Sequence, residues 1–230
     1  TGFTSEGGLS NFNKRSVVKI GNLLCGDVSS FDFNASDVRA MGRLCRNADS
    51  GARLATVLVS RQASVRALAR QPDGATLIGG FFARIGSTQR NLVRVSATGG
   101  FDIGFNPLSN TQSVSALHVR GDGNIYVDSF PQLLKLNASG IIDPAFQANF
   151  NGSVVALLPS PDGLIAGGFF SQANGLARVG VAKVDFATGA VNPTWNPGLS
   201  SGQVRALASD SSGAVYLGGS FTSINGNPRN

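Results

Sequence analysis

The stretch VRALARQPDGATLIGGF, residues 65–81, decides the fold because its pattern returns three more times along the chain. Its opening, Val-x-Ala-Leu, recurs at Val114, Val154 and Val204. The starts follow one another at intervals of about 40 to 50 residues, a period typical of propeller blades and of other repeat folds. The chain is therefore expected to consist of copies of one small β-unit.

A tight turn follows each opening at a similar offset and predicts a β-hairpin. Proline presets φ in such a turn, aspartate bonds to the local backbone, and glycine adopts a positive φ. The second strand then ends in Gly-Gly near a phenylalanine in three copies, whereas the second copy has Val127-Asp128-Ser129-Phe130. Glycine weakens a strand, so the repeated pair predicts a close approach of backbones where blades converge. The turns are Pro72-Asp73-Gly74, Gly121-Asp122-Gly123, Pro161-Asp162-Gly163 and Ser211-Ser212-Gly213.

A third strand follows in the first three copies, and its single basic residue is expected to point outward. Three or four short strands with turn signals every 8–12 residues predict an all-β fold, a β-propeller of four to five four-stranded blades. A stack of β-solenoid coils is the structural alternative. The third strands are residues 92–95, 133–136 and 181–184, and the segments that close the copies are 101–107, 142–146 and 192–197.

The consecutive pattern Val-x-Ala-Leu, Pro-Asp-Gly, Gly-Gly-x-Phe, Leu-x-Arg-Val and Asp-x-x-Phe-Asn-Pro resembles the delta-60 repeat, a domain type of bacterial extracellular or surface proteins. The resemblance covers roughly residues 62–230 and is specific in the first, third and fourth copies. The second copy lacks both the Gly-Gly pair and the proline of the turn. The resemblance implies a propeller-like β-fold and an envelope or extracellular setting, and it transfers no catalytic residues.

The chain divides into an N-terminal β segment, residues 1–61, and a repeat propeller, residues 62–230. Residues 15–20 are similar to the third strand at 90–95, whereas the last copy stops before its own third strand. An incomplete blade exposes an unpaired edge that tends to recruit a strand. We expect the segment to close the last blade within one chain or between subunits, through Val17, Val18, Lys19 and Ile20.

The rest of the N-terminal segment is less regular. Val38-Arg39-Ala40-Met41 is similar to the strand starts, so this part is either a shortened blade or a separate insertion. Cys25 and Cys45 are the only cysteines, and an isolated pair predicts a disulfide in an oxidising compartment. No zinc site is expected, because His118 is the only histidine and the two cysteines cannot complete a tetrahedral set with it alone.

The net charge of +6 comes mainly from residues 1–70, which hold ten Lys/Arg and five Asp/Glu. These arginines are candidates for binding an anionic surface such as a glycan, and a solvated arginine-rich face is the plainer alternative. No nucleic-acid motif accompanies them, so no nucleic-acid partner is expected. No run of 18 apolar residues occurs, so no membrane span is expected. The candidate patch is Arg39, Arg43, Arg46 and Arg53.

Candidate catalytic groups are scarce. His118 has no adjacent partner that would make it a general base, so no catalytic residue is assigned. The recurring aspartates have structural explanations in turns, and no loop has the dense Asp-x-Asp-x-Asp spacing of calcium sites. No cofactor or metal is therefore expected, with calcium as a minor alternative. Candidate ligand-binding aromatics are Trp195, Tyr126 and Tyr216, with packing between blades as the alternative.

These observations predict a non-enzymatic extracellular or cell-surface structural and interaction protein of bacterial type. It would present a rigid propeller to a protein partner, or associate with itself by strand addition. A carbohydrate-binding propeller, with equivalent pockets between blades, is the main alternative. A hydrolase or lyase acting at one end of the propeller is the third, because the fold allows it in principle.

Overall fold

The structure is a computed structural model of the chain, and it describes residues 18–20, 23–28, 42–47, 53–56, 64–81, 90–98, 102, 104–108 and 113–229, with side chains from residue 65 onward. The chain falls into two compact units, residues 1–111 and 112–230. Throughout the described ranges the regular elements are short β-strands, and none of them is a helix. The predicted all-β class is confirmed.

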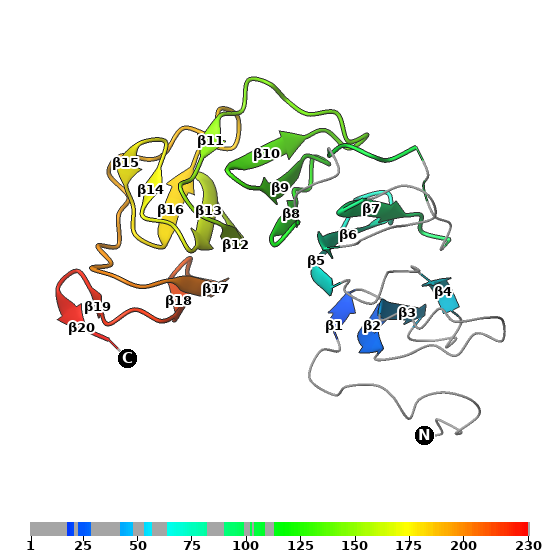
Figure 1. Cartoon of the computed structure of the whole chain (residues 1–230), viewed down its shortest axis with the longest axis horizontal. Helices are drawn as coiled ribbons and strands as arrows, with labels where there is room; N and C mark the ends of the chain where they lie inside the picture. Colours follow the sequence, from blue (N-terminus) through cyan, green and yellow to red (C-terminus); the bar gives the residue numbers. More distant parts are fainter. Residues whose placement is uncertain are drawn as a thin grey trace. The chain divides into compact units, whose positions relative to one another are not determined.

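Unit 1 holds two antiparallel sheets (Figure 1). The N-terminal sheet has the order β1-β2-β3-β4, and blade 1, with the order β5-β6-β7, contains the first copy of the repeat. Both sheets follow the chain strand by strand, so each consecutive pair is joined by a simple connection. The strands are β1 Val18–Ile20, β2 Leu23–Val28, β3 Gly42–Asn47, β4 Arg53–Thr56, β5 Ser64–Arg70, β6 Thr76–Phe81 and β7 Leu92–Val95.

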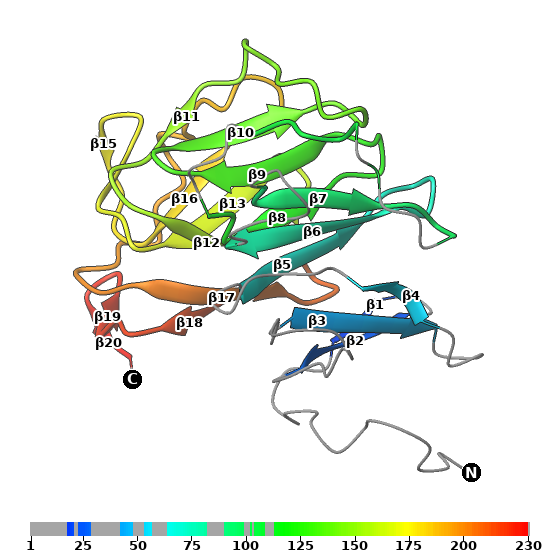
Figure 2. The same ribbon diagram turned by 45° about the vertical axis from the view of Figure 1, so that its right-hand side comes forward.

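Unit 2 holds blades 2, 3 and 4, which contain the remaining copies; blades 2 and 3 lie side by side in both ribbon views (Figures 1 and 2). The first strand of blade 3, β12, contacts the first strands of blades 2 and 4, as expected for the innermost strands of a propeller. The strands are β8 Leu117–Val119, β9 Ile125–Ser129, β10 Gln132–Leu136 and β11 Ala148–Asn149 in blade 2, β12 Val154–Ser160, β13 Gly163–Gly168 and β16 Val181–Val184 in blade 3, and β17 Val204–Ser209 and β18 Val215–Gly219 in blade 4.

The core of unit 2 lies between neighbouring blades because both faces of β13 are covered. Leu164 and Ala166 pack in one cluster with Tyr126 of blade 2. Ile165 points to the other face and packs with Val204 of blade 4. Successive strand residues face opposite sides of a sheet, so a central blade must be apolar at every position, and all six residues of β13 are buried.

The Gly-Gly pairs serve two different close contacts. A Cβ on Gly168 would lie 2.1 Å from the backbone oxygen of Ser153, at the bulge in β12, and Gly219 meets Gln203 in the same way. A Cβ on Gly167 would lie 2.8 Å from Val204 Cγ1 of blade 4. Close approach therefore occurs at the second glycine, which presses against its own blade in blades 3 and 4, and at the first glycine of blade 3, which faces blade 4.

The predicted hairpin turns occur in all four copies, but the turn glycines do not all behave alike. Gly74, Gly123 and Gly213 have φ of +84°, +88° and +85°. In the third copy Gly163 belongs to β13 and pairs with Ser160, so the turn consists of two residues, Pro161 and Asp162. The prediction of a positive φ at this glycine was wrong, because this copy is one residue shorter between the turn and the Gly-Gly pair.

Two further hairpins extend blades 3 and 4 and were not predicted. The first joins β14, Gln172–Ala173, to β15, Leu176–Ala177, and the second joins β19, Ser223–Ile224, to β20, Asn227–Pro228. Both turn on an Asn-Gly pair with positive φ, at Asn174-Gly175 and Asn225-Gly226. Positive φ at both central residues identifies the type I′ turn, whose twist matches that of paired strands.

The basic residue of the third strand does not point outward as predicted. Lys183 is 8% exposed and its Nζ lies 2.7 Å from Asp162 Oδ2. The two equivalent residues are also ion-paired, Arg94 with Asp102 at 2.6 Å and Lys135 with Asp143 at 2.8 Å. A cation whose side chain is largely buried needs a carboxylate partner, so this position forms an ion pair with a partly exposed aspartate in each of the first three copies.

Candidate functional site

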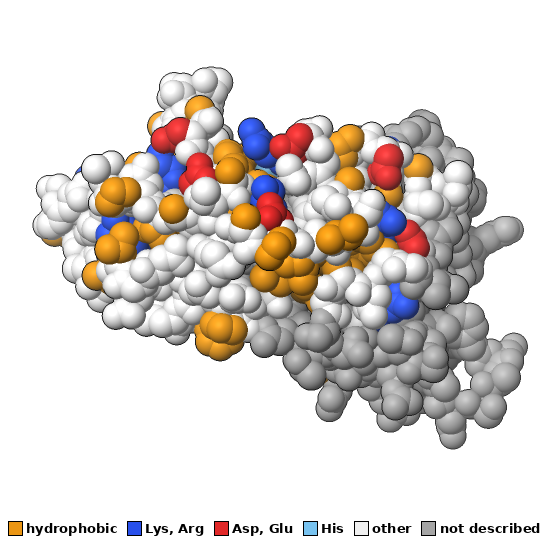
Figure 3. All heavy atoms as spheres, turned by 90° about the horizontal axis from the view of Figure 1, so that it is seen from above, with side chains coloured by type: hydrophobic (Ala, Val, Ile, Leu, Met, Phe, Trp, Pro, Cys, Tyr) orange, Lys and Arg blue, Asp and Glu red, His pale blue; other side chains and the backbone are white. Residues whose placement is uncertain are grey.

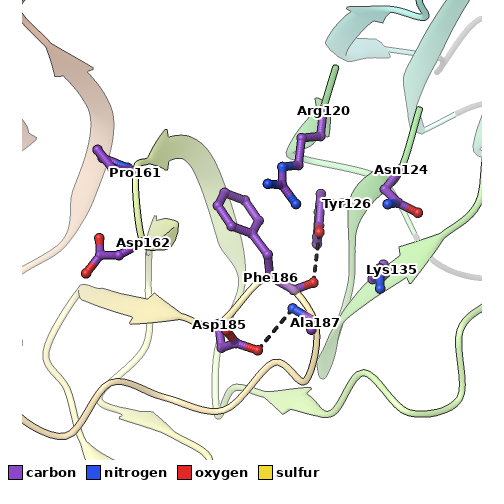
Figure 4. A pocket seen from close by; sticks show the side chains of 9 residues that line it. All are labelled: Arg120, Asn124, Tyr126, Lys135, Pro161, Asp162, Asp185, Phe186 and Ala187. Atoms are coloured by element: carbon purple, nitrogen blue, oxygen red, sulfur yellow. Dashed lines mark hydrogen bonds between the residues drawn. The ribbon is translucent and has the colours of Figure 1, made fainter. Parts of the chain in front are cut away.

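A pocket of about 270 Å³ lies between blades 2 and 3, and its lining combines turn and loop residues with two strand residues, Tyr126 of β9 and Lys135 of β10 (Figure 4). The β8–β9 turn supplies one side of it. The β12–β13 turn and the loop that follows β16 supply the other. The lining residues are Arg120, Asn124, Tyr126, Lys135, Pro161, Asp162, Asp185, Phe186 and Ala187.

Phe186 connects the two sides of this pocket. Its ring lies beneath the Arg120 guanidinium, with 4.4 Å between Cζ and the ring centroid, and 5.6 Å from the Tyr126 ring. The Tyr126 hydroxyl donates a hydrogen bond of 2.9 Å to the Phe186 carbonyl oxygen. One aromatic residue of blade 3 is thus held between a cation and a buried tyrosine of blade 2, which fixes the position of the loop.

The loop after β16 is ordered by Asp185. Its Oδ1 accepts hydrogen bonds from the backbone N–H groups of Ala187 and Thr188 and from the Thr188 hydroxyl, at 3.0, 2.8 and 2.7 Å. These bonds, first of all that from the Thr188 side chain, hold the pKa of Asp185 below its usual value. The carboxylate at the pocket is therefore ionised at neutral pH.

Charges of both signs line the pocket, and three of the four charged side chains, Arg120, Lys135 and Asp162, are in ion pairs. Arg120 lies 3.3 Å from Asp122, Lys135 2.8 Å from Asp143, and Asp162 2.7 Å from Lys183. Burial raises the pKa of Tyr126 to about 12, so its hydroxyl stays protonated as a donor. Figure 3 shows the same mixture on one face of the molecule, where acidic and basic side chains lie beside one another.

Comparison with known proteins places the chain among β-propellers. Residues 71–105 match the family described as a domain of unknown function (DUF5122) beta-propeller. No curated protein sequence matches the chain. The resemblance to the delta-60 repeat stays an expectation, because the family match covers less than one copy of the repeat.

Solved structures share the fold at low sequence identity. The extracellular domain of BT4673 from B. thetaiotaomicron matches with a TM-score of 0.56 and 16% identity over 87% of this chain. That of BT3049 from the same organism, described as a hybrid two component system, gives 0.52 and 17% over 93%. This chain spans only 25% and 26% of those two chains. The computationally designed protein Ika8 gives 0.53 and 14%, with 87% of this chain and 69% of Ika8 covered.

The three candidate aromatics have different surroundings. Tyr126 is fully buried rather than exposed, and it is one of the residues that line the pocket, so its role as a ligand aromatic stays a prediction. Trp195 is half-buried and packs in the cluster between blades 3 and 4. Tyr216 is 58% exposed, and its hydroxyl donates to Asp210 Oδ2 at 2.9 Å. The structure therefore does not bring the three together.

His118 lies on β8 beside Tyr126, with 6.4 Å between ring centroids. Burial, aided by the Arg120 charge, lowers the pKa of His118 below its usual value, so the ring is neutral at pH 7. The recurring aspartates accept backbone bonds in turns, as Asp73 does from Ala75 N at 2.9 Å. Among the described residues no group of three or more His, Cys, Asp or Glu side chains is arranged to hold a metal ion.

The N-terminal candidates are described only as backbone. β2 pairs with β3 in a register that sets Cys25 opposite Cys45. Directly opposed residues of antiparallel strands have Cα atoms about 4.5–5.5 Å apart, within the range of a disulfide. The disulfide stays a prediction, because the side chains lie outside the described residues. The register also sets Arg46 opposite Arg53, while Arg43 lies on β3 and Arg39 is not described.

The predicted closing strand is found in the N-terminal sheet. Val18, Lys19 and Ile20 form β1 and pair with β2, whereas Val17 lies outside the described residues. β1 is an edge strand of that sheet, so one of its sides is paired by β2. Closure of the last blade by this segment stays a prediction. In the described part of the chain, no helix is both long and apolar enough to cross a membrane.

Arg120 and Phe186 were not predicted as site residues. The signal for Phe186 was a difference in loop length: five residues, 185–189, follow β16, whereas the equivalent loops at 96–99 and 137–140 have four. Arg120 occupies the position that is Gln71 in the first copy and Ser160 in the third. Departures from the repeat, rather than the repeat itself, mark this site.

Proposed function

We propose that the chain is a non-enzymatic β-propeller module that acts outside the cell and binds a partner through the turns that join its strands. The fold is that of extracellular domains of bacterial proteins such as BT4673. The observation that carries the proposal is the pocket between blades 2 and 3, which is lined mostly by turn and loop residues of the two blades and includes Phe186, whose ring lies under Arg120. Ligand-binding pockets combine apolar surface with a few placed polar groups, and this lining has both.

The ionisable side chains near the pocket support a binding role over a catalytic one. Lys135 and Asp143 form an ion pair, and hydrogen bonds from Lys135 and the Ala145 backbone lower the pKa of Asp143. A general acid needs a pKa near the working pH, and such carboxylates are far from it. The carboxylates are used to order the blades.

The turns are also rigid in a way that suits recognition. Asp185 and Asp210 each accept several bonds from their own turns, and Asn151 accepts from Ser171 N and Gln172 N at 2.9 Å each. Preorganised loops lose little conformational entropy on binding, which favours affinity. A partner would meet a surface that is already in its binding conformation.

The extracellular setting is tested by labelling cells that produce the protein with an antibody against the chain. We expect intact cells to be labelled as strongly as permeabilised cells, with a cytoplasmic protein labelled only after permeabilisation. Cross-linking on intact cells, followed by mass spectrometry, should then attach the chain to an envelope or secreted component. Labelling that requires permeabilisation would refute the proposal.

A carbohydrate-binding propeller is the second candidate, and the same pocket favours it. This function would use a single pocket rather than the predicted set of equivalent pockets. Arg120 and Phe186 are each found in one copy of the repeat, and the other copies have different residues at these positions. A hydrolase or lyase would need a catalytic group. His118, the single histidine of the sequence, is the candidate general base for such a reaction. Turnover of any substrate that is abolished by His118→Ala would establish that third function instead.

Assembly by strand addition remains part of the proposal. Within the described strands β13 is paired on both sides, by β12 and β16, whereas β18 is paired by β17 alone. An unpaired edge is a template for another strand. Deletion of residues 1–20 should lower the thermal stability or change the oligomeric state if the N-terminal strand pairs there, and no change in either would exclude this part.

A further inference from the structure

We propose that the pocket between blades 2 and 3 binds one neutral sugar residue of a glycan. The inference deepens the proposed binding role of this pocket by naming its ligand class. It rests on the charge balance of the lining, on the unused hydrogen-bonding capacity of the charged groups, and on the apolar surface beside them.

The lining disfavours a charged ligand. Two cations, Arg120 and Lys135, face two carboxylates, Asp162 and Asp185, and three of these four are already in ion pairs of 2.7 to 3.3 Å. An anion would compete with Asp122 and Asp143 for the cations, and an added cation would compete with Lys183. A neutral ligand adds bonds without separating any of these pairs.

The charged groups retain capacity for further hydrogen bonds. The three bonds to Asp185 all end on Oδ1, and an ionised carboxylate offers about four acceptor sites over its two oxygens. A guanidinium has five N–H donors and an ammonium three, so Arg120 and Lys135 can each serve one carboxylate and still donate to a ligand. Bonds to charged groups are the stronger ones.

A ligand that uses this lining must accept hydrogen bonds from the cations of blade 2 and donate hydrogen bonds to a carboxylate of blade 3. Lys135 and Asn124 belong to blade 2, whereas the acceptor Asp185 belongs to the loop of blade 3 (Figure 4). A hydroxyl group both donates and accepts, so vicinal hydroxyls can reach both sides whichever way the ring lies. Pro161 and Phe186 supply apolar surface for the C–H faces of a sugar ring.

The size of the pocket limits the ligand to a small one. Its volume of about 270 Å³ is below the range of about 300–1,000 Å³ for sites that hold drug-sized molecules. One sugar ring is therefore the appropriate unit. Binding of a longer glycan would place the neighbouring residues outside the pocket.

The experiment titrates the ¹⁵N-labelled chain with the methyl glycosides of glucose, galactose and mannose, with methyl glucuronide and with free glycine, and follows backbone amide shifts. We expect at least one neutral glycoside to shift the amides of Asp185, Phe186 and Ala187. Arg120→Gln and Asp185→Asn should each weaken that binding about tenfold or more. Arg205→Gln is the matched control, because Arg205 also lies over an aromatic ring, that of Phe169, at 5.3 Å in unit 2.

Three results would overturn the inference. These are the absence of any shift with neutral glycosides up to about 10 mM, shifts of the wild-type chain that map away from the pocket, and tighter binding of methyl glucuronide or glycine than of every neutral glycoside. The wild-type map decides the matter even if a variant fails to fold. Such a result would leave the extracellular interaction role standing, because surface labelling and cross-linking test that role independently.

Discussion

Lys183 on β16 pairs with Asp162 in the β12–β13 turn, with 2.7 Å between Nζ and Oδ2, although the equivalent residues in other copies have a different partner. Arg94 and Lys135, at the equivalent position, each pair with an aspartate eight residues further along the chain. In the third copy, whose loop after β16 is one residue longer, the equivalent residue is Asn192, whose Oδ1 accepts turn bonds from Thr194 N and Trp195 N at 3.0 and 2.9 Å. An amide can order the turn but cannot neutralise the lysine.

This relationship predicts a rescue. Asp162→Asn should lower the thermal midpoint by a few degrees, because Lys183 is left among packed blades without a carboxylate. Adding Asn192→Asp should restore most of the loss by recreating the arrangement of the other copies. Differential scanning calorimetry of the two single variants and the double variant measures this. A double variant no more stable than Asp162→Asn would show that the two partners are not interchangeable.

Two tyrosines at equivalent repeat positions provide a second prediction. Tyr126 is buried and donates to Phe186 O, whereas Tyr216 is 58% exposed and donates to Asp210. Tyr126→Phe should reduce the free energy of unfolding by about 1 kcal/mol, because the half-buried Phe186 carbonyl loses its donor. Tyr216→Phe should change it by no more than about 0.5 kcal/mol. Urea unfolding of the pair measures both, and equal effects would contradict the assigned roles.

The repeat pattern in the sequence predicted the strands well and the pocket poorly, because strands depend on local sequence and the pocket depends on packing between blades. Turn chemistry and apolar pattern act locally, so the start of β12 at Val154 and the turn at Gly123 could be read from the sequence. The burial of Lys183 depends on which blade packs over the strand, and a local pattern carries no such information. The pocket depends on Phe186, which lies in a loop one residue longer than its equivalents. The sequence shows the added residue, but only the structure shows that its ring lies under Arg120 of blade 2.

The Gly-Gly pair provides a third prediction. Gly168→Ala should destabilise the protein by about 2–3 kcal/mol, because the new Cβ would lie 2.1 Å from the Ser153 oxygen, a backbone atom that cannot rotate away. Gly218→Ala is the matched control, since its Cβ would meet Ala206 Cβ at an ordinary 3.6 Å. We expect the control to stay within about 0.5 kcal/mol of the wild type. Denaturant titration distinguishes the two, and a tolerated alanine at residue 168 would contradict the bulge contact.

The stability of unit 2 should depend on pH through His118. Burial lowers its pKa in the folded state, so the unfolded chain binds a proton at a higher pH than the folded chain does. Stability is therefore present above the unfolded pKa of about 6.5 and is lost as pH falls from there toward the lowered value. The aspartates with lowered pKa values stay ionised in this window and add no slope. Thermal midpoints between about pH 7.5 and 5 should fall for the wild type and change less for His118→Gln.

The register of the N-terminal sheet makes the disulfide prediction sharper than the sequence alone did. Cys25 and Cys45 are opposed on β2 and β3, so a bridge would tie two strands that already pair. Thiol titration of the unfolded, unreduced protein should detect no free thiol, and reduction should lower the stability by about 3 kcal/mol in the chain-entropy model. The double variant Cys25→Ala/Cys45→Ala should match the reduced wild type and be insensitive to reductant. Two titratable thiols in protein secreted from cells would refute the disulfide, and with it the argument that these cysteines indicate an oxidising compartment.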